Sequence, residues 1–328
     1  MLLRSAFDYE SIFNSKSKNA FIDATKLKVK NMIKSMYFYD EVNKMWGQSG
    51  IGTVASVSSQ TVTVTTAEWA PAIWLGSENR SVLFETSGGA LRGTASVASY
   101  DIKARTVTFD ALPAGTAGTD VMRFAAQGLA GVNVSLGIYD IITSSSTLFN
   151  IAQTYGMWKS AGTYAAGSAP LSFTKIMNAI NQGVNKGLGD DINEIEVAVS
   201  TGAWNDLNKD QAALREVDSS YRREEGDNGF ENIVYSCTAG RVRIVPLKTM
   251  KEGYAFIHPK CERAFERVGS QPEPTFALPG QKDGKSEEYL RVMENNAGVE
   301  SRLYCNTSLF TDSVHGMVLV SGIVNSVA

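Results

Sequence analysis

The amino-acid sequence predicts an α+β fold into which a small all-β barrel or sandwich domain has been inserted. A helical hydrophobic pattern runs from Asn19 to Trp46 and stops abruptly at Gly47. The next eighty residues, Gln48 to Gln127, hold only eleven charged side chains and are dominated by Thr, Val, Ser, Ala and Gly. Helical pattern returns near Tyr139. A β-type block enclosed by α-type sequence is the pattern of one domain inserted into another.

The first segment is expected to form one long helix. Its apolar residues recur at spacings of three, four and seven, which places a hydrophobic stripe along one side: Ile22, Val29, Met32, Ile33, Met36, Tyr39, Val42 and Trp46. A basic helix can contact nucleic acid, because each lysine that neutralises a phosphate releases counterions. The alternative is an ordinary solvated face. Both interpretations apply to the four lysines that occupy the remaining positions: Lys26, Lys28, Lys30 and Lys34.

The inserted block shows the period of two that half-buried strands have. Residues 61–65 and 106–109 alternate Thr with apolar residues, and Ser/Gly/Pro clusters lie between such runs. Residues 96–100 and 105–109 flank a short turn and predict a local hairpin. We therefore expect the block to fold on its own and the rest of the chain to tolerate its replacement by a short linker.

Two tryptophans of the block, Trp69 and Trp74, allow two interpretations. They either anchor a small core that has few large side chains or lie exposed and stack on sugars. The first interpretation is favoured. The predicted core of the block contains both tryptophans and six further residues: Ile73, Leu83, Phe84, Val107, Phe109 and Phe124.

After the block, a mixed Ser/Thr-rich stretch precedes a second amphipathic helix from Phe173 to Gly187. Ser172 is suited to cap its start, and glycines stop it. A strand over residues 194–199 follows. Thr201 is expected to cap the next helix, which begins around Ala203.

The rest of the chain alternates strands with loops. Residues 219–229 form a charged loop that includes Arg222, Arg223, Glu224 and Glu225, and such charge pairs are usually exposed. The prolines in 271–274 and 279–280 predict a stiff connector, because proline fixes its own φ. Strands are expected at 231–236, 241–246, 253–257, 301–306 and 317–323.

The composition of the chain limits the classes of protein to which it can belong. The chain has 328 residues, 43% of them apolar and 20% charged, which is typical of a folded protein of two or three domains. The net charge of −3 implies no general attraction to nucleic acid. There is no run of the ~20 apolar residues that a membrane-spanning helix requires, and the first residues lack a signal-peptide core, so we expect a cytosolic protein without a membrane partner.

Motifs for catalysis or cofactor binding are absent from the sequence. The three cysteines, Cys237, Cys261 and Cys305, are widely spaced and read as ordinary thiols. The two histidines, His258 and His315, each lie beside a chain-breaking residue. There is no Gly-x-Ser-x-Gly elbow and no phosphate-binding Gly-rich loop before a helix. We predict that the protein is not an enzyme and has no catalytic, cofactor-binding or metal-binding residues.

Several local features in order resemble the major capsid proteins of tailed bacteriophages, the Hong Kong 97 type. They are the strand and Trp/Leu helix at 199–207, the run Gly-Arg-Val-Arg-Ile-Val-Pro at 240–246, residues 250–257 and the terminal 316–323. Residues 19–24 and 46–50 are similar to a subgroup in which a β-domain follows the long helix. The order and spacing of these features carry the resemblance.

The resemblance implies a peripheral domain, with a long spine helix and an elongated sheet, and an axial domain around the centre of each capsomer. By residue number this gives a peripheral N-terminal segment and spine helix at 1–47, an inserted β-domain at 48–128, peripheral residues at 129–193, an axial domain at 194–269 and a peripheral return at 270–328. The family normally has an extended arm and a β-hairpin loop before the spine helix. Only eighteen residues precede Asn19 here, so we expect these elements to be removed or much reduced.

The resemblance also implies function and partners. The chain would be a virion protein that assembles in the host cytoplasm into pentamers and hexamers of an icosahedral head shell. Its other partners would be scaffold and portal proteins and packaged double-stranded DNA, bound without sequence specificity. The four lysines of the long helix would face the lumen, and the Arg222–Glu225 loop would lie at capsomer contacts.

Two alternatives stay open. One is another phage structural protein, such as a tail-tube or decoration protein, whose β-modules also self-associate. The other, with less support, is a glycan-acting hydrolase in which the β-block binds carbohydrate.

Overall fold

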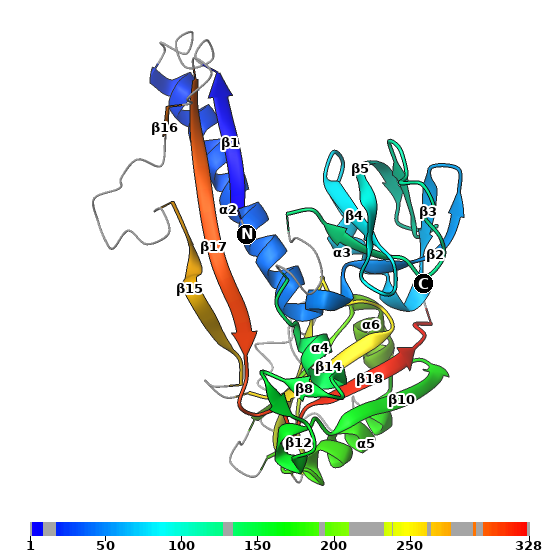
Figure 1. The fold of residues 1–328 in the computed structure, drawn as a ribbon. Helices are drawn as coiled ribbons and strands as arrows, with labels where there is room; N and C mark the ends of the chain where they lie inside the picture. Colours follow the sequence, from blue (N-terminus) through cyan, green and yellow to red (C-terminus); the bar gives the residue numbers. More distant parts are fainter. Residues whose placement is uncertain are drawn as a thin grey trace.

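The computed structural model describes residues 2–8, 18–126, 134–189, 194–209, 233–237, 239–260, 264–276, 291–292 and 298–326. Three parts are visible in Figure 1: a long helix beside an elongated sheet, a closed β-barrel, and a six-stranded sheet with helices. The long helix and the barrel both rise from the same side of the six-stranded sheet (Figure 1). The protein is therefore a mixed α and β structure.

The elongated part consists of helix α2 (Lys18–Trp46) and strands β1 (Leu2–Asp8), β15 (Glu266–Thr275), β16 (Arg291–Val292) and β17 (Gly298–Phe310). Strand β17 pairs antiparallel with the other three. The bounds of α2 confirm the predicted helix. The helix lies along β17 because alternate residues of the strand face it and meet the helical stripe in a small cluster: Met32, Met36, Leu303 and Cys305.

The prediction of a stiff connector at 271–274 is wrong, because these residues belong to strand β15. The strand lies at the edge of its sheet, and its pairing with β17 is irregular on both sides of Gln271. Proline is tolerated at sheet edges and at bulges, where its missing N–H breaks no regular ladder. Strand β1 was not expected from the sequence; its seven residues are all in register with β17.

The barrel closes through the strand order β2-β3-β6-β5-β4-β7. The predicted hairpin is confirmed, because β5 and β6 pair antiparallel across the turn that follows Asp101. The barrel strands are β2 (Gly52–Ser58), β3 (Thr61–Val64), β4 (Ser81–Glu85), β5 (Leu91–Asp101), β6 (Thr106–Phe109) and β7 (Val121–Phe124).

All eight residues predicted for the core of this block are buried. Trp69 and Trp74 are 1% and 0% exposed and stack on each other with ring centroids 6.2 Å apart. The favoured interpretation of the two tryptophans is thus confirmed. The barrel core is also continuous with that of the six-stranded sheet, through residues such as Trp46 and Phe256. Independent folding of the barrel stays a prediction.

The six-stranded sheet has the order β10-β18-β14-β11-β13-β12. Strands β10 and β18, and β11 and β13, pair in parallel, and the other neighbours are antiparallel. Late strand β18 lies between β10 and β14, so the C-terminal segment completes this sheet. The strands are β10 (Gly162–Ala169), β11 (Glu194–Val199), β12 (Ile233–Cys237), β13 (Gly240–Pro246), β14 (Tyr254–Pro259) and β18 (Val318–Ile323).

The two faces of this sheet pack against different partners. On β14, Ala255 and Ile257 join the core formed with helices α5 (Phe173–Val184) and α6 (Thr201–Lys209), whereas Phe256 points to the barrel side. This division follows from the period of two along a strand. The sheet is therefore covered by α5 and α6 on one face and by the end of α2 and the barrel on the other.

Both helices of this region carry serine caps. Ser172 Oγ accepts a hydrogen bond from the Lys175 N–H, as the sequence predicts for α5. Helix α6 begins two residues earlier than predicted, and Ser200 Oγ, rather than Thr201, accepts from the Ala203 N–H. The sequence allows either hydroxyl to cap the helix. Because strand β11 ends at Val199, Ser200 is the residue that takes the capping position.

Short elements complete the described chain. Three 3₁₀ turns, two short helices and one small hairpin connect the parts above: η1 (Gly47–Ser49), η2 (Thr66–Glu68), α3 (Pro71–Trp74), α4 (Ile138–Thr143), β8 (Thr147–Leu148), β9 (Ile151–Ala152) and η3 (Gly156–Trp158).

Candidate functional site at the junction of the long helix, the barrel and the six-stranded sheet

The long helix ends at a tightly constrained glycine. Gly47 has φ +45°, a conformation that side chains with a Cβ rarely adopt. A Cβ there would lie 2.1 Å from the Gly137 backbone nitrogen, so the space is closed as well. Gly47 thus ends α2 and lets the chain turn into the barrel against the start of α4.

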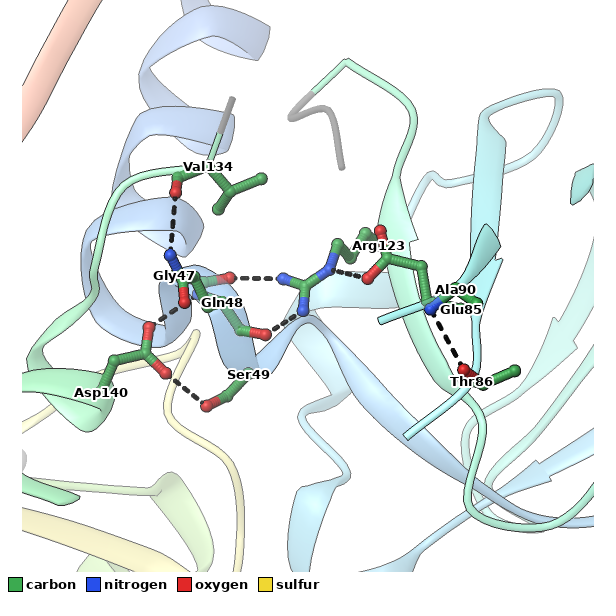
Figure 2. Close-up of polar contacts among 9 residues, drawn as sticks. All are labelled: Gly47, Gln48, Ser49, Glu85, Thr86, Ala90, Arg123, Val134 and Asp140. Carbon is green, nitrogen blue, oxygen red and sulfur yellow. Dashed lines mark hydrogen bonds and ion pairs between the residues drawn. The ribbon is translucent and has the colours of Figure 1, made fainter. Parts of the chain in front are cut away.

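Asp140 of α4 holds this turn in place (Figure 2). Its carboxylate accepts hydrogen bonds from the Gln48 N–H at 2.6 Å, from Ser49 Oγ at 2.6 Å and from the Gly137 N–H at 2.9 Å. Burial raises the pKa of this carboxyl, and the three donors and Arg123 oppose the rise. Asp140 therefore ties the start of α4 to the end of the long helix.

Arg123 binds the same turn from the barrel side (Figure 2). Its NH1 donates to the Gly47 carbonyl at 2.7 Å, its NH2 donates to the Gln48 carbonyl, and its Nε lies 2.9 Å from Glu85 Oε2. The side chains of Arg123 and Glu85 are 3% and 1% exposed. A guanidinium at carbonyls that follow a helix also complements the negative end of the helix dipole. Strand β7 of the barrel thus supplies the C-terminal cap of the long helix.

Lys251 forms the third part of the junction. Its side chain is 2% exposed, and its Nζ lies 4.4 Å from the centre of the Trp46 ring and 3.3 Å from Glu68 Oε2. Thr53 Oγ1 donates to the same Glu68 oxygen at 2.8 Å. Burial lowers the pKa of Lys251, and Glu68 opposes the change. The charged end of Lys251 therefore links the segment before strand β14 to Trp46 of the long helix and to Glu68 of the inserted block.

The segment 247–253, between β13 and β14, makes further backbone contacts with both neighbours. The Glu252 N–H donates to the Trp69 carbonyl at 2.9 Å and the Gly253 N–H to the Ala67 carbonyl at 2.8 Å. The Trp46 indole donates to the Thr249 carbonyl at 3.0 Å. One segment of the main sheet thereby holds the barrel and the helix end at the same time.

The candidate lysines do not all have the same surroundings. Lys30 and Lys34 are exposed and lie one helical turn apart. Lys28 is exposed too, with its Nζ 3.4 Å from the Ala6 carbonyl of β1. Lys26 belongs to α2, and its side chain lies outside the described residues. That these four lysines face a lumen stays a prediction.

Some of the other residues singled out from the sequence lie outside the described part of the chain. Arg222, Arg223, Glu224 and Glu225 fall outside the described residues, as does Cys261. Burial lowers the pKa of His258, whose Nδ1 is 3.0 Å from the Pro259 carbonyl, and the Glu196 carboxylate opposes this change.

Within the described ranges, no group of three or more His, Cys, Asp or Glu side chains is arranged to hold a metal ion. No helix among these residues is long and apolar enough to cross a membrane.

Sequence reasoning marked Gly47 as the end of the long helix and Trp46 as part of its hydrophobic stripe, but it did not select Arg123, Asp140 or Lys251. One signal was present: Arg123 interrupts an otherwise apolar strand in a block that has few charges. The sequence does not indicate that Lys251 is buried, because this lysine lies in a turn next to Glu252, where a lysine is usually solvated. Asp140 and Gly47 are far apart in the sequence, and only the tertiary structure brings them together.

Comparison with solved structures finds similar chains among viral and virus-like shells. The capsid of cyanophage A-1(L) is 10% identical with a TM-score of 0.46, over 98% of this chain and 77% of that one. The procapsid of satellite phage P4 gives 9% identity and a TM-score of 0.37, over 99% and 70%. A virus-like particle from Pyrococcus furiosus gives 13% and 0.27, over 45% and 47%. No protein-family model matches the chain, and no curated protein matches it either.

Proposed function

We propose that this chain is a structural shell subunit, the major capsid protein of a tailed phage of the Hong Kong 97 type. The observation that carries the proposal is the pairing of a 29-residue helix with an elongated sheet, set beside a separate compact sheet. This arrangement supports the division into peripheral and axial parts that the sequence resemblance implies. The fold and the sequence resemblance support the proposal, and the three shells compared above, with TM-scores below 0.5, add no support to it.

The junction suits such a role mechanically. A shell subunit must keep its parts at fixed angles, since small angular errors add up over a closed lattice. Arg123, Asp140 and Lys251 fix the helix end, the barrel and the six-stranded sheet to one another by buried polar contacts. Buried pairs of this kind are costly to break, because each leaves a charge without its partner.

The finer parts of the proposal concern domains and partners. We assign residues 1–47, 129–193 and 270–328 to a peripheral domain, 194–269 to an axial domain and 48–128 to an inserted β-domain. The subunit would form pentamers and hexamers, meet scaffold and portal proteins in the host cytoplasm, and enclose double-stranded DNA in the virion. The lysines of α2 would face this DNA, and the Arg222–Glu225 loop would contact neighbouring subunits.

The hydrolase alternative loses its main support. Its case rested on Trp69 and Trp74 as exposed platforms for sugars, and both side chains are buried in the barrel. The tail-tube or decoration alternative remains, and it differs in the assembly that it predicts: rings that stack into tubes, or binding to preformed heads.

Sedimentation separates these assemblies. The purified chain, alone and co-expressed with a scaffold protein from the same phage cluster, should form rings of five and six subunits or closed shells. Tubes would favour the tail alternative. Monomers under every salt and protein concentration, with and without scaffold, would contradict the proposal.

A further inference from the structure

The segment that joins α3 to β4 consists of two successive tight turns. The Ser77 N–H donates to the Trp74 carbonyl at 3.0 Å, and the Arg80 N–H donates to the Ser77 carbonyl at 2.9 Å. The third residue of each turn has positive φ, +69° at Gly76 and +61° at Asn79. The first and fourth Cα atoms of a β-turn lie within about 7 Å of each other. The Cα atom of Ser77 therefore lies within about 7 Å of the Cα atoms of both Trp74 and Arg80.

These three residues present buried polar atoms without hydrogen-bond partners in the described structure: Trp74 Nε1, Ser77 Oγ and Arg80 NH1. Trp74 and Ser77 are both 0% exposed. An indole and a guanidinium can only donate, and a hydroxyl can donate as well. Buried polar groups are nearly always paired, so three neighbouring donors indicate an acceptor with several lone pairs.

The described surroundings of the Arg80 guanidinium are aromatic. Its guanidinium carbon lies 5.1 Å from the ring centre of Phe38, 5.2 Å from Tyr39 and 5.6 Å from Phe124. The Trp74 ring contacts the same Phe124, with centroids 6.2 Å apart. Ring faces attract a cation and do not neutralise it. Among the described residues, no carboxylate lies within ion-pair distance of Arg80.

We propose that Trp74, Ser77 and Arg80 form a binding site for an oxyanion, a carboxylate or phosphate group, at the seam between the barrel and the long helix. A guanidinium supplies charge and a planar pair of donors that match such a group. The indole and the hydroxyl add two neutral donors from the same pair of turns. Arg80 as a whole is partly exposed, whereas its NH1 is buried. The site is separate from the junction and does not depend on the shell function.

The test measures thermal unfolding of the 328-residue chain in chloride, acetate and inorganic phosphate at equal ionic strength. A ligand that binds only the folded state raises the midpoint in proportion to the logarithm of its concentration once the site fills. The midpoint should therefore rise with acetate or phosphate above the value in chloride. Trp74→Phe replaces the indole by a smaller aromatic ring without an N–H donor, and we expect roughly ten-fold weaker apparent binding. Arg80→Lys should weaken binding further by removing the fork.

Lys103→Met is the matched control, because it removes one positive charge from an exposed barrel turn. It should leave the anion response unchanged. A response to phosphate alone identifies a phosphate site, and a response to acetate as well identifies a carboxylate site. Equal midpoints in the three salts would overturn the proposal, because the donors would then bind water only. An unchanged response in Trp74→Phe would also overturn it, even if Arg80→Lys fails to fold.

Discussion

Gly253 makes a tight contact with Ala67 of the inserted block, directly before strand β14 of the six-stranded sheet. A Cβ added there would lie 2.5 Å from the Ala67 Cβ, 2.7 Å from its Cα and 2.8 Å from its carbonyl oxygen. Ordinary carbon–carbon contacts need about 3.5–4.0 Å, so the 247–253 segment and the barrel would have to separate. Gly253→Ala should therefore act by displacing the barrel.

The magnitude follows from two contributions. Overpacking costs about 1–3 kcal/mol, and loss of the 2.8 Å hydrogen bond from the Gly253 N–H to the Ala67 carbonyl adds about 0.5–1.5 kcal/mol, so the free energy of unfolding should fall by about 1.5–4.5 kcal/mol. Urea denaturation followed by tryptophan fluorescence measures this, because Trp46, Trp69 and Trp74 all lie near the contact.

Two alanine substitutions serve as controls. A Cβ at Gly88 would approach only Thr86 Oγ1, at 3.7 Å, and one at Gly156 would meet nothing within 4 Å. Both variants should stay within about 0.5 kcal/mol of the parent. If Gly253→Ala behaves like these controls, the barrel is not held by the 247–253 segment and the account of the junction is wrong.

Three further predictions concern single contacts. Arg123→Met should lower the free energy of unfolding by about 3–5 kcal/mol, because Glu85 loses a buried cationic partner; thermal or urea unfolding that matches the parent would contradict this. The difference in free energy of unfolding between the parent and Lys251→Met should rise with pH. The rise should lie between the lowered pKa of Lys251 in the folded protein and its ordinary value of 10.5, because the unfolded chain binds more protons in that range. If urea titrations from pH 7 to 10 give a constant difference, burial does not perturb this lysine. The third change replaces Lys26, Lys28, Lys30 and Lys34 of the long helix by Gln. It should leave the fold stable and alter DNA retention or scaffold binding. Unchanged assembly and unchanged DNA content would show that these lysines form only a solvated face.

Periodicity accounts for the parts of the fold that were predictable. The long helix, the barrel hairpin and five strands of the six-stranded sheet each carry a period of 3.6 or 2 over enough residues to be identified, whereas strand β10 was not predicted. Strand β15 was missed because two prolines normally argue against a strand, and its place at a sheet edge removes that objection.

The junction was not predictable, for a different reason. Gly47 meets Gly137, and Lys251 meets Glu68, across separations in the sequence that no local pattern records. Each of these residues has an ordinary local role as a helix stop, a turn or a solvated charge. Closure of the barrel against the main sheet is what gives them buried partners, and that closure is a property of the whole chain.

Electron microscopy of the purified protein tests the proposed function most directly. The shell account predicts rings of five and six subunits or closed icosahedral particles when the chain is expressed with a scaffold protein, and loss or distortion of these particles in Gly253→Ala. Uniform monomers or stacked tubes from a chain that unfolds cooperatively would contradict the capsid function.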